Sequence, residues 1–227
     1  HSLAIKSGNK FITYGISEKV FDADENAEIR EGRFCAMCGA KMHYNYYHYS
    51  QLGDYVCPEC GFKRPEIDYP ATHIHHGDHL EFTVEGNHIN ARYKGFYNIY
   101  NILAVYAVAS HSGLDMKGFQ SMLDHFNPEN GRIEHFNIKG TDVELNLAKN
   151  PAGFNQNINA VMADPKDKDV IILINDRDQD GNDVSWLWDV DFDRFTDKSI
   201  KSITVSGIRC QDMRLRLKYV DIPSHLE

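Results

Sequence analysis

The sequence predicts an α/β protein of two domains, with a small four-cysteine element inserted in the first. In the second half, strand-like runs such as "DVIILIND" and "SITVSG" alternate with helix-like runs, which is typical of a parallel α/β sheet. Two Cys-x-x-Cys pairs lie close together in a chain with five cysteines. The polar stretch "NPENGR" at 127–132 breaks the pattern, so we place the domains at 1–126 and 127–227.

The first domain is expected to begin with a short strand in "KFITYGI" and to continue, after the cysteines, with a β-hairpin. "HLEFTVEGNHINARYKG" alternates apolar and polar residues around a Gly-Asn turn, as a hairpin with one buried face requires. "NIYNILAVYAVASHSG" has helical spacing and stops at Gly113, a favourable C-cap. "DMKGFQSMLDHF" predicts one more helix.

In the second domain, "VELNLAKNPAGF" leads to the strand "DVIILIND" and a polar loop. The helix-like "DFDRFTDKSI", the strand "SITVSG" and the helix "CQDMRLRLKYV" follow. Cys210 stands at the start of that last helix, and we interpret it as an ordinary structural residue.

Charge and composition exclude some classes of function. The 227 residues carry a formal net charge of −9, which argues against nucleic-acid binding because that requires a concentrated basic face. No stretch approaches the roughly 20 apolar residues of a membrane span, and the first residues lack the pattern of a signal peptide. We therefore expect a cytoplasmic protein, in which paired cysteines favour metal over disulfides.

Cys35, Cys38, Cys57 and Cys60 predict a structural zinc ribbon over about 32–66. Two Cys-x-x-Cys pairs can place four sulfurs on one tetrahedral ion, which leaves no open position for catalysis. The glycines that follow Cys38 and Cys60 allow the turns of two metal-binding knuckles. His43 and His48 are interpreted as surface or packing residues. Unmetallated thiols or a redox pair are the alternatives.

Two further motifs give weaker signals. His73, His75, His76 and His79 in "THIHHGDH" could hold a second metal, but a polar strand edge explains them better because they do not share one face. "DRDQDGND" copies the start of an EF-hand calcium loop, yet its twelfth position is Leu187. The loop follows the C-terminal end of a predicted parallel strand, a position that indicates catalysis or partner docking. The alternative is a solvated acidic turn.

Several stretches resemble a known family. "GFYNIYNILAVYAVA" resembles the central-domain helix of Mur ligases, and "NGRIEHF" the entry to their C-terminal domain. The ribbon, "NLAKNPAGFNQ" and "LINDRDQDGNDVSWLWDVDFD", in this order, resemble the MurT family, the ligase-like subunits of lipid II isoglutaminyl synthases. The resemblance covers essentially the whole chain. It implies part of a Mur ligase central domain with the inserted ribbon, followed by a truncated, Rossmann-like C-terminal domain with a mainly parallel sheet.

The resemblance also implies an activity. Such subunits amidate the α-carboxyl of D-glutamate in lipid II to D-isoglutamine, using ATP, Mg²⁺ and ammonia from a GatD-like glutaminase partner. Lipid II would bring the protein to the inner face of the membrane. The chain lacks a G-x-x-x-x-G-K-[ST] phosphate loop, so we expect a fragment that is inactive alone. An interaction module that only docks a partner is the alternative function.

Residue roles implied by the resemblance concern the nucleotide and the partner. Asn98 and Asn101 match the asparagines at the adenine edge, and Arg132 matches an arginine that reaches the nucleotide. Capping of the helix by Asn98 and a surface position for Arg132 are the alternatives. Asp183 is the residue expected to complete the glutaminase's Cys-His pair, with Asp189 and Asp191 as rivals that could instead cap a helix. This chain has Asn146 at a position where Mur ligases that add an amino acid often carry aspartate. The difference fits ammonia, rather than an amino acid, as the incoming nucleophile.

Overall fold

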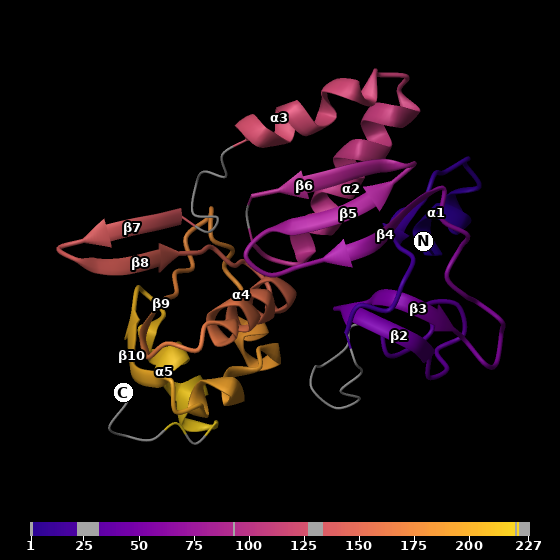
Figure 1. Cartoon of the computed structure of the whole chain (residues 1–227). Helices are drawn as coiled ribbons and strands as arrows, with labels where there is room; N and C mark the ends of the chain where they lie inside the picture. Colours follow the sequence, from indigo (N-terminus) through magenta and orange to yellow (C-terminus); the bar gives the residue numbers. More distant parts are fainter. Residues whose placement is uncertain (1, 22–31, 93, 127–133, 221, 223–227) are drawn as a thin grey trace. The chain divides into compact units, whose positions relative to one another are not determined.

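The structure is a computed structural model of the whole chain, and it describes residues 2–21, 32–92, 94–126, 134–220 and 222 (Figure 1). Two compact units are present, His1–Asn127 and Pro128–Glu227. The division falls at the start of 127–132, the stretch in which the sequence places a domain boundary, although 127–133 lie outside the described residues. Each unit is described by itself below.

Within its described residues, the first unit contains a four-stranded mixed sheet, a two-stranded hairpin and three α-helices. The sheet has the order β1-β4-β5-β6, in which β1 runs parallel to β4 and the other neighbours are antiparallel. The elements are α1 (Ser2–Ser7), β1 (Tyr14–Ile16), β2 (His43–Tyr49), β3 (Leu52–Val56), β4 (Tyr69–His75), β5 (Leu80–Val84), β6 (Asn87–Ala91), α2 (Tyr97–His111), the 3₁₀ helix η1 (Met116–Gly118) and α3 (Phe119–His125).

The core of this unit lies between the sheet and the helices α2 and α3. One face of α2 is buried against β1, β4 and β5, while α3 lies along β6. The largest fully buried side chains are Ile16, Leu80, Phe82, Ile89, Ile99, Leu103 and Tyr106. Burial of these apolar groups is the main source of stability and fixes the position of α2 on the sheet.

The hairpin β5–β6 is confirmed, with its turn one residue earlier than predicted. Val84 pairs with Asn87, so Glu85 and Gly86 form the two-residue turn. Their φ angles of 48° and 76° both lie in the left-handed region, which a type I′ turn requires. The turn residues are therefore Glu85 and Gly86 rather than Gly86 and Asn87. Glycine readily adopts one of the two left-handed conformations, and Asn87 already belongs to β6.

The helix α2 ends as the sequence predicts. Gly113 has φ 79°, and its N–H donates to the carbonyl of Ser110. The N–H of Leu114 donates to the carbonyl of Ala109 at 3.1 Å, which completes a Schellman-type end.

The described part of the second unit is built from a parallel strand pair, a separate hairpin, two α-helices and two 3₁₀ helices. Its elements are β7 (Glu134–Ile138), β8 (Thr141–Leu145), α4 (Pro151–Ala163), β9 (Lys168–Leu173), η2 (Ser185–Asp189), η3 (Phe192–Thr196), β10 (Ile200–Ser206) and α5 (Cys210–Lys218). β9 and β10 are parallel, as expected, and their inner faces join the helices in one core. Among the described residues the antiparallel pair β7–β8 is separate from this sheet, so the expected mainly parallel sheet is present only as β9–β10.

Several elements of this unit were not predicted as such, among them β7, β8, α4 and η2. "VELNLAKNPAGF" spans β8 and the first turn of α4, and the start of that helix is marked by Asn150, whose Oδ1 accepts from the N–H of Gly153 at 2.8 Å. Pro151 occupies the first helical turn, where its missing N–H costs nothing. The helix-like "DFDRFTDKSI" contains only the short 3₁₀ helix η3.

Candidate functional site

The two cysteine pairs form matching turns on either side of the β2–β3 hairpin. In the first, the N–H of Gly39 donates to the carbonyl of Cys35 at 2.8 Å. In the second, the N–H of Gly61 donates to the carbonyl of Cys57 at 3.0 Å. The two glycines have φ 78° and 72°, in the left-handed region that favours glycine. This explains why a glycine follows the second cysteine of each pair. We call residues 32–66 the ribbon.

The four sulfur atoms of the ribbon fit one tetrahedral metal ion. Sγ of Cys35 lies 3.6 Å from Sγ of Cys60, and Sγ of Cys38 lies 3.5 Å from Sγ of Cys57. All four lie within 4.8 Å of one another, and within the described part of the chain this is the one group of three or more such ligands. Zinc–sulfur bonds of about 2.3 Å give tetrahedral edges of about 3.8 Å. The cysteines therefore suit zinc, with no position left for a substrate.

Ionisation of these thiols differs within the cluster. Burial opposes ionisation of Cys35, but hydrogen bonds from the N–H groups of Met37 and Cys38 and from neighbouring thiols lower the pKa of its thiol to about 7. The N–H of Ala40 favours the thiolate of Cys38, yet the neighbouring thiols and burial raise the pKa of Cys38 to about 12. Four thiolates at this distance repel one another, so the fully ionised set requires a cation.

His43 and His48 stand outside the sulfur cluster, as the sequence predicts. His43 is exposed at the start of β2. His48 is buried, with Nδ1 2.6 Å from the hydroxyl of Tyr100 and Nε2 2.9 Å from the carbonyl of Glu18. It is a packing residue that joins the ribbon to the rest of the first unit.

The histidines of "THIHHGDH" do not converge on a metal. His73 has φ 55°, and the pairing of β4 with β5 shifts register between Thr72 and His75, so the strand does not place these rings on one face. His76 packs against Phe21 and Phe96 instead. His75 and His79 stack with ring centres 5.1 Å apart, outside the one metal-ligand group of the described residues.

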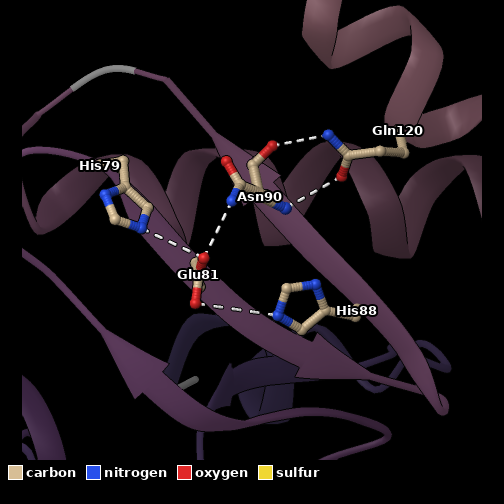
Figure 2. A network of polar contacts seen from close by, with 5 residues as sticks. All are labelled: His79, Glu81, His88, Asn90 and Gln120. Carbon is tan, nitrogen blue, oxygen red and sulfur yellow. Dashed lines mark hydrogen bonds and ion pairs between the residues drawn. The ribbon is translucent and has the colours of Figure 1, made fainter.

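Glu81 organises this face of the sheet, and reasoning from the sequence did not single it out. Figure 2 shows its carboxylate between two imidazoles, with Nε2 of His79 at 3.1 Å and Nε2 of His88 at 3.9 Å. The amide of Asn90 donates to the same carboxylate at 2.9 Å, and the main chain of Asn90 pairs twice with Gln120 of α3. The network thus links α3 to β5 and β6. Glu81 lies directly opposite Asn90 in the β5–β6 register.

The loop after β9 contains Asp183 and is held by an ion pair and by backbone hydrogen bonds. Asp176 pairs with Arg209 at 3.4 Å, and the N–H groups of Asp180 and Gly181 donate to the carbonyl of Arg177. The acidic side chains of this loop are outside the one metal-ligand group found among the described residues. The twelfth position of the EF-hand pattern is Leu187, whose side chain offers no carboxylate ligand.

Asp183 lines a cavity of about 300 Å³ in the second unit. Its Oδ1 accepts from the N–H of Ser185 at 2.8 Å, and hydrogen bonds from the N–H and the hydroxyl of Ser185 lower the pKa of Asp183, so its carboxylate is ionised at neutral pH. The other residues that line the cavity are Asn182, Val184, Ser185, Leu187, Trp188, Arg209, Asp212 and Leu215. Arg209 and Asp212 were missed because their helix follows the loop by more than 20 residues.

The rival carboxylates occupy different places in the same segment. Asp189 is the last residue of η2 and is exposed. Asp191 precedes η3 without a side-chain capping bond, and its N–H donates to Oδ1 of Asn155 at 2.9 Å. The capping role considered for Asp191 is therefore not observed, and neither residue lines the cavity of Asp183.

Asn98 and Asn101 form a bonded pair in the first two turns of α2. Nδ2 of Asn101 donates to Oδ1 of Asn98 at 3.1 Å, and Nδ2 of Asn98 donates to the carbonyl of Lys94 at 2.8 Å. The helix begins after Phe96, so the capping role considered for Asn98 is wrong. Asn101 is exposed. Arg132 lies outside the described residues.

Two remaining residues have local roles. Asn146 donates through Nδ2 to Oδ1 of Asn157 in α4 at 2.8 Å. Cys210 is the first residue of α5, as the sequence predicts. No described helix is both long and apolar enough to cross a membrane.

Comparison with known proteins finds similarity to one family. Residues 147–226 match the family described as MurT ligase C-terminal. The chain is 31% identical over 216 residues to the MurT subunit of lipid II isoglutaminyl synthase (glutamine-hydrolyzing) from Staphylococcus aureus strain COL, a match that covers 95% of this chain and 49% of the relative. The corresponding Streptococcus pneumoniae subunit is 34% identical, over 86% of this chain and 44% of the relative. The chain spans about half the length of these relatives.

Solved structures show the same fold at lower identity. A pseudomurein peptide ligase type C from Methanothermus fervidus matches with TM-score 0.65 and 22% identity, over 88% of this chain and 42% of that one. MurF from Acinetobacter baumannii matches with TM-score 0.53 and 16% identity, over 71% and 35%. The fold is therefore Mur ligase-like, and the resemblance drawn from the sequence is confirmed.

Proposed function

Because the chain resembles MurT ligase subunits along almost its whole length, we propose that it is part of an enzyme that amidates the peptidoglycan stem peptide. The substrate is lipid II, whose D-glutamate α-carboxyl becomes the amide of D-isoglutamine. The observation that carries this proposal is the match of 95% of the chain to a subunit named for that product. The Mur ligase-like fold supports carbon–nitrogen ligation as the reaction class.

The nucleotide role is assigned to the first unit, and to Arg132. ATP and Mg²⁺ supply activation of the carboxyl as an acyl phosphate. Asn98 and Asn101 would read the adenine edge, for which a side-chain amide is suited because it donates and accepts at once. The exposed position of Asn101 and its bond to Asn98 support this role, since the pair is held in one orientation. Arg132 would contact the nucleotide with its permanently charged guanidinium group.

The ammonia is proposed to come from a GatD-like glutaminase subunit to which Asp183 contributes. A carboxylate bonded to one imidazole nitrogen fixes the tautomer and stabilises the imidazolium that forms when the partner's cysteine is deprotonated. Two properties support Asp183. Its bond to the N–H of Ser185 holds the carboxylate in place, and its lowered pKa keeps it ionised. Asp189 and Asp191 remain the rivals.

Zinc is proposed as a structural component of the ribbon. Sulfur from all four cysteines would complete the coordination sphere, so the ion would supply folding energy and no Lewis-acid chemistry. The reaction itself is assigned to the nucleotide, the carboxylate substrate and ammonia.

The test is ATP-dependent amidation of lipid II by the full-length subunit with its glutaminase, with ammonium chloride as the nitrogen source. Mass spectrometry of the stem peptide should find an amide at the α-carboxyl of D-glutamate only when ATP and Mg²⁺ are present. Stable association with the glutaminase but no amide under any condition would reject the proposal and favour an interaction module.

A further inference from the structure

His48 is the point at which the ribbon enters the core of the first unit. It lies near the end of β2, is only 6% exposed, and contacts two segments outside the ribbon. Nδ1 faces the hydroxyl of Tyr100 in α2 at 2.6 Å, and Nε2 faces the carbonyl of Glu18 at 2.9 Å. When both nitrogens of a buried imidazole are hydrogen-bonded, the partners fix which nitrogen carries the proton. A buried polar group left without a hydrogen bond would cost stability.

The tautomer of His48 follows from these partners. A carbonyl oxygen can only accept, so the contact with Glu18 requires the proton on Nε2. Nδ1 is then the acceptor, and the hydroxyl of Tyr100 donates to it. Burial, the largest influence, lowers the pKa of His48 to about 4, which keeps the ring neutral at physiological pH. Nδ1 of His48 therefore stays available as the acceptor of the bond from α2 under those conditions.

Arg64 makes a second contact between the ribbon and the rest of the first unit. Arg64, four residues after Cys60, donates through Nη2 to the carbonyl of Ile16 in β1 at 2.6 Å and through Nη1 to the hydroxyl of Tyr46 at 2.7 Å. A Cβ on Gly15 would come 2.9 Å from Nη2 of Arg64, so glycine allows this close approach. The ribbon is thus fixed to β1 as well as to α2.

The start of α2 depends on neighbours outside the helix. No side chain caps its first turn, and its N-cap residue is Phe96. The ring of Phe96 packs against His48, with ring centres 5.7 Å apart, and against Tyr49 at 6.1 Å. Tyr49 also meets Tyr100 at 5.7 Å. Ribbon side chains therefore cover the turn in which a capping side chain would otherwise hold the helix end.

We propose that His48 is a positioning residue through which the metal-closed ribbon holds the first turns of α2, and with them the pair Asn98–Asn101. Tyr100, which binds His48, lies between these two asparagines in the helix. Loss of the metal or oxidation of the cysteines would loosen the ribbon and so release the start of α2. The role of the asparagines rests on the proposed function, whereas the coupling of the ribbon to α2 does not.

Matched substitutions of His48 separate its two contacts. The amide of asparagine stands near Nδ1 of histidine, so His48→Asn can keep the bond from Tyr100. The amide of glutamine stands near Nε2, so His48→Gln can keep the bond to Glu18. Tyr100→Phe removes only the hydroxyl. The proposal expects faster amide hydrogen exchange over 97–103 in His48→Gln and Tyr100→Phe, by about tenfold or more, and near wild-type exchange in His48→Asn.

Metal removal is the second arm, in the full-length protein. Chelation should speed exchange over 97–103, and α5 in the second unit is the internal control for global unfolding. If α2 exchanges at the wild-type rate in His48→Gln, in Tyr100→Phe and after chelation, the proposed coupling is wrong. If α5 changes equally, the variants report unfolding and the specific coupling is likewise rejected.

Nucleotide kinetics distinguish this inference from the function on which it builds. His48→Gln should raise KM for ATP more than it lowers kcat, and His48→Asn should restore KM, because only the position of the adenine-reading pair changes. If exchange in α2 responds as expected while Asn101→Ala leaves KM unchanged, the coupling stands and the adenine role of the asparagines fails.

Discussion

The hydroxyl of Tyr100 lies 2.6 Å from Nδ1 of His48, and this bond joins helix α2 to the hairpin between the two cysteine pairs. The ring of His48 is neutral because burial lowers its pKa from 6.5 to about 4. The ribbon is therefore part of the first unit's core rather than an appendage. Its contribution to stability depends on pH.

We predict that acid destabilises the first unit through His48. The folded-state pKa is below the unfolded one, so the unfolded chain binds the extra proton. The stabilisation is complete above about pH 6.5 and is lost progressively down to about pH 4, by about 3 kcal/mol in total. Denaturant melts at several pH values measure this slope. His48→Gln should flatten it.

The control for this prediction is His88→Gln, since the side chain of His88 is exposed. That variant should keep the wild-type slope between pH 6.5 and 4. An identical slope in wild type and His48→Gln would show that the imidazole of His48 does not titrate as its burial requires.

Cys57→Ser is expected to remove zinc and unfold the ribbon. A site that loses one of four thiolates loses most of a binding free energy on the order of 10 kcal/mol. Metal analysis should find about one zinc per wild-type chain and little in the variant, with Cys210→Ser, in α5, as the matched control that keeps its zinc. Association with the glutaminase should persist. A folded Cys57→Ser protein that has lost its partner would contradict the separation of the two roles.

Gly207→Ala should destabilise the second unit strongly. Gly207 has φ 92°, and a Cβ there would come 2.3 Å from the carbonyl oxygen of Ile174, so the variant suffers both backbone strain and a clash. We expect a loss of about 3 kcal/mol or more. Gly181→Ala is the matched control, because Gly181 has φ 88° but open space around it, and about 1 kcal/mol is expected there. Equal losses in thermal melts would exclude the clash.

Asp183→Asn should abolish glutamine hydrolysis in the complex while sparing amidation from free ammonia. Loss of an orienting carboxylate costs at least about a hundredfold in turnover. The loss is measured as the rate of glutamine hydrolysis by the complex. A binding assay must show that the variant still forms the complex. Wild-type turnover in this variant would transfer the role to Asp189 or Asp191, or remove it from this subunit.

Local patterns predicted the elements that depend on local chemistry. The cysteine pairs with their glycines, the end of α2 at Gly113 and the strands β9 and β10 follow from spacing and turn residues, and all are present. Asn150 and Pro151 are the local signals for the start of α4.

Long-range contacts were not predictable in the same way. His48 reaches Tyr100 across 52 residues, and the cavity of Asp183 is also lined by Arg209, just before α5, and by Asp212 in α5. Neither contact produces a periodic pattern in the sequence. Each depends on how elements that are distant in the sequence pack together. The place of Glu81 between two histidines likewise appears only once β5 and β6 are in register.

The most direct test of the proposed activity follows the nitrogen atom. The full-length subunit and its glutaminase are incubated with lipid II, ATP, Mg²⁺ and glutamine labelled with ¹⁵N in the side-chain amide, in the presence of unlabelled ammonium. Mass spectrometry of the stem peptide is predicted to find ¹⁵N in the α-amide of D-isoglutamine, and the unlabelled amide with the Asp183→Asn variant. An α-carboxyl that stays free under all conditions, although both subunits are folded and associated, would contradict the account.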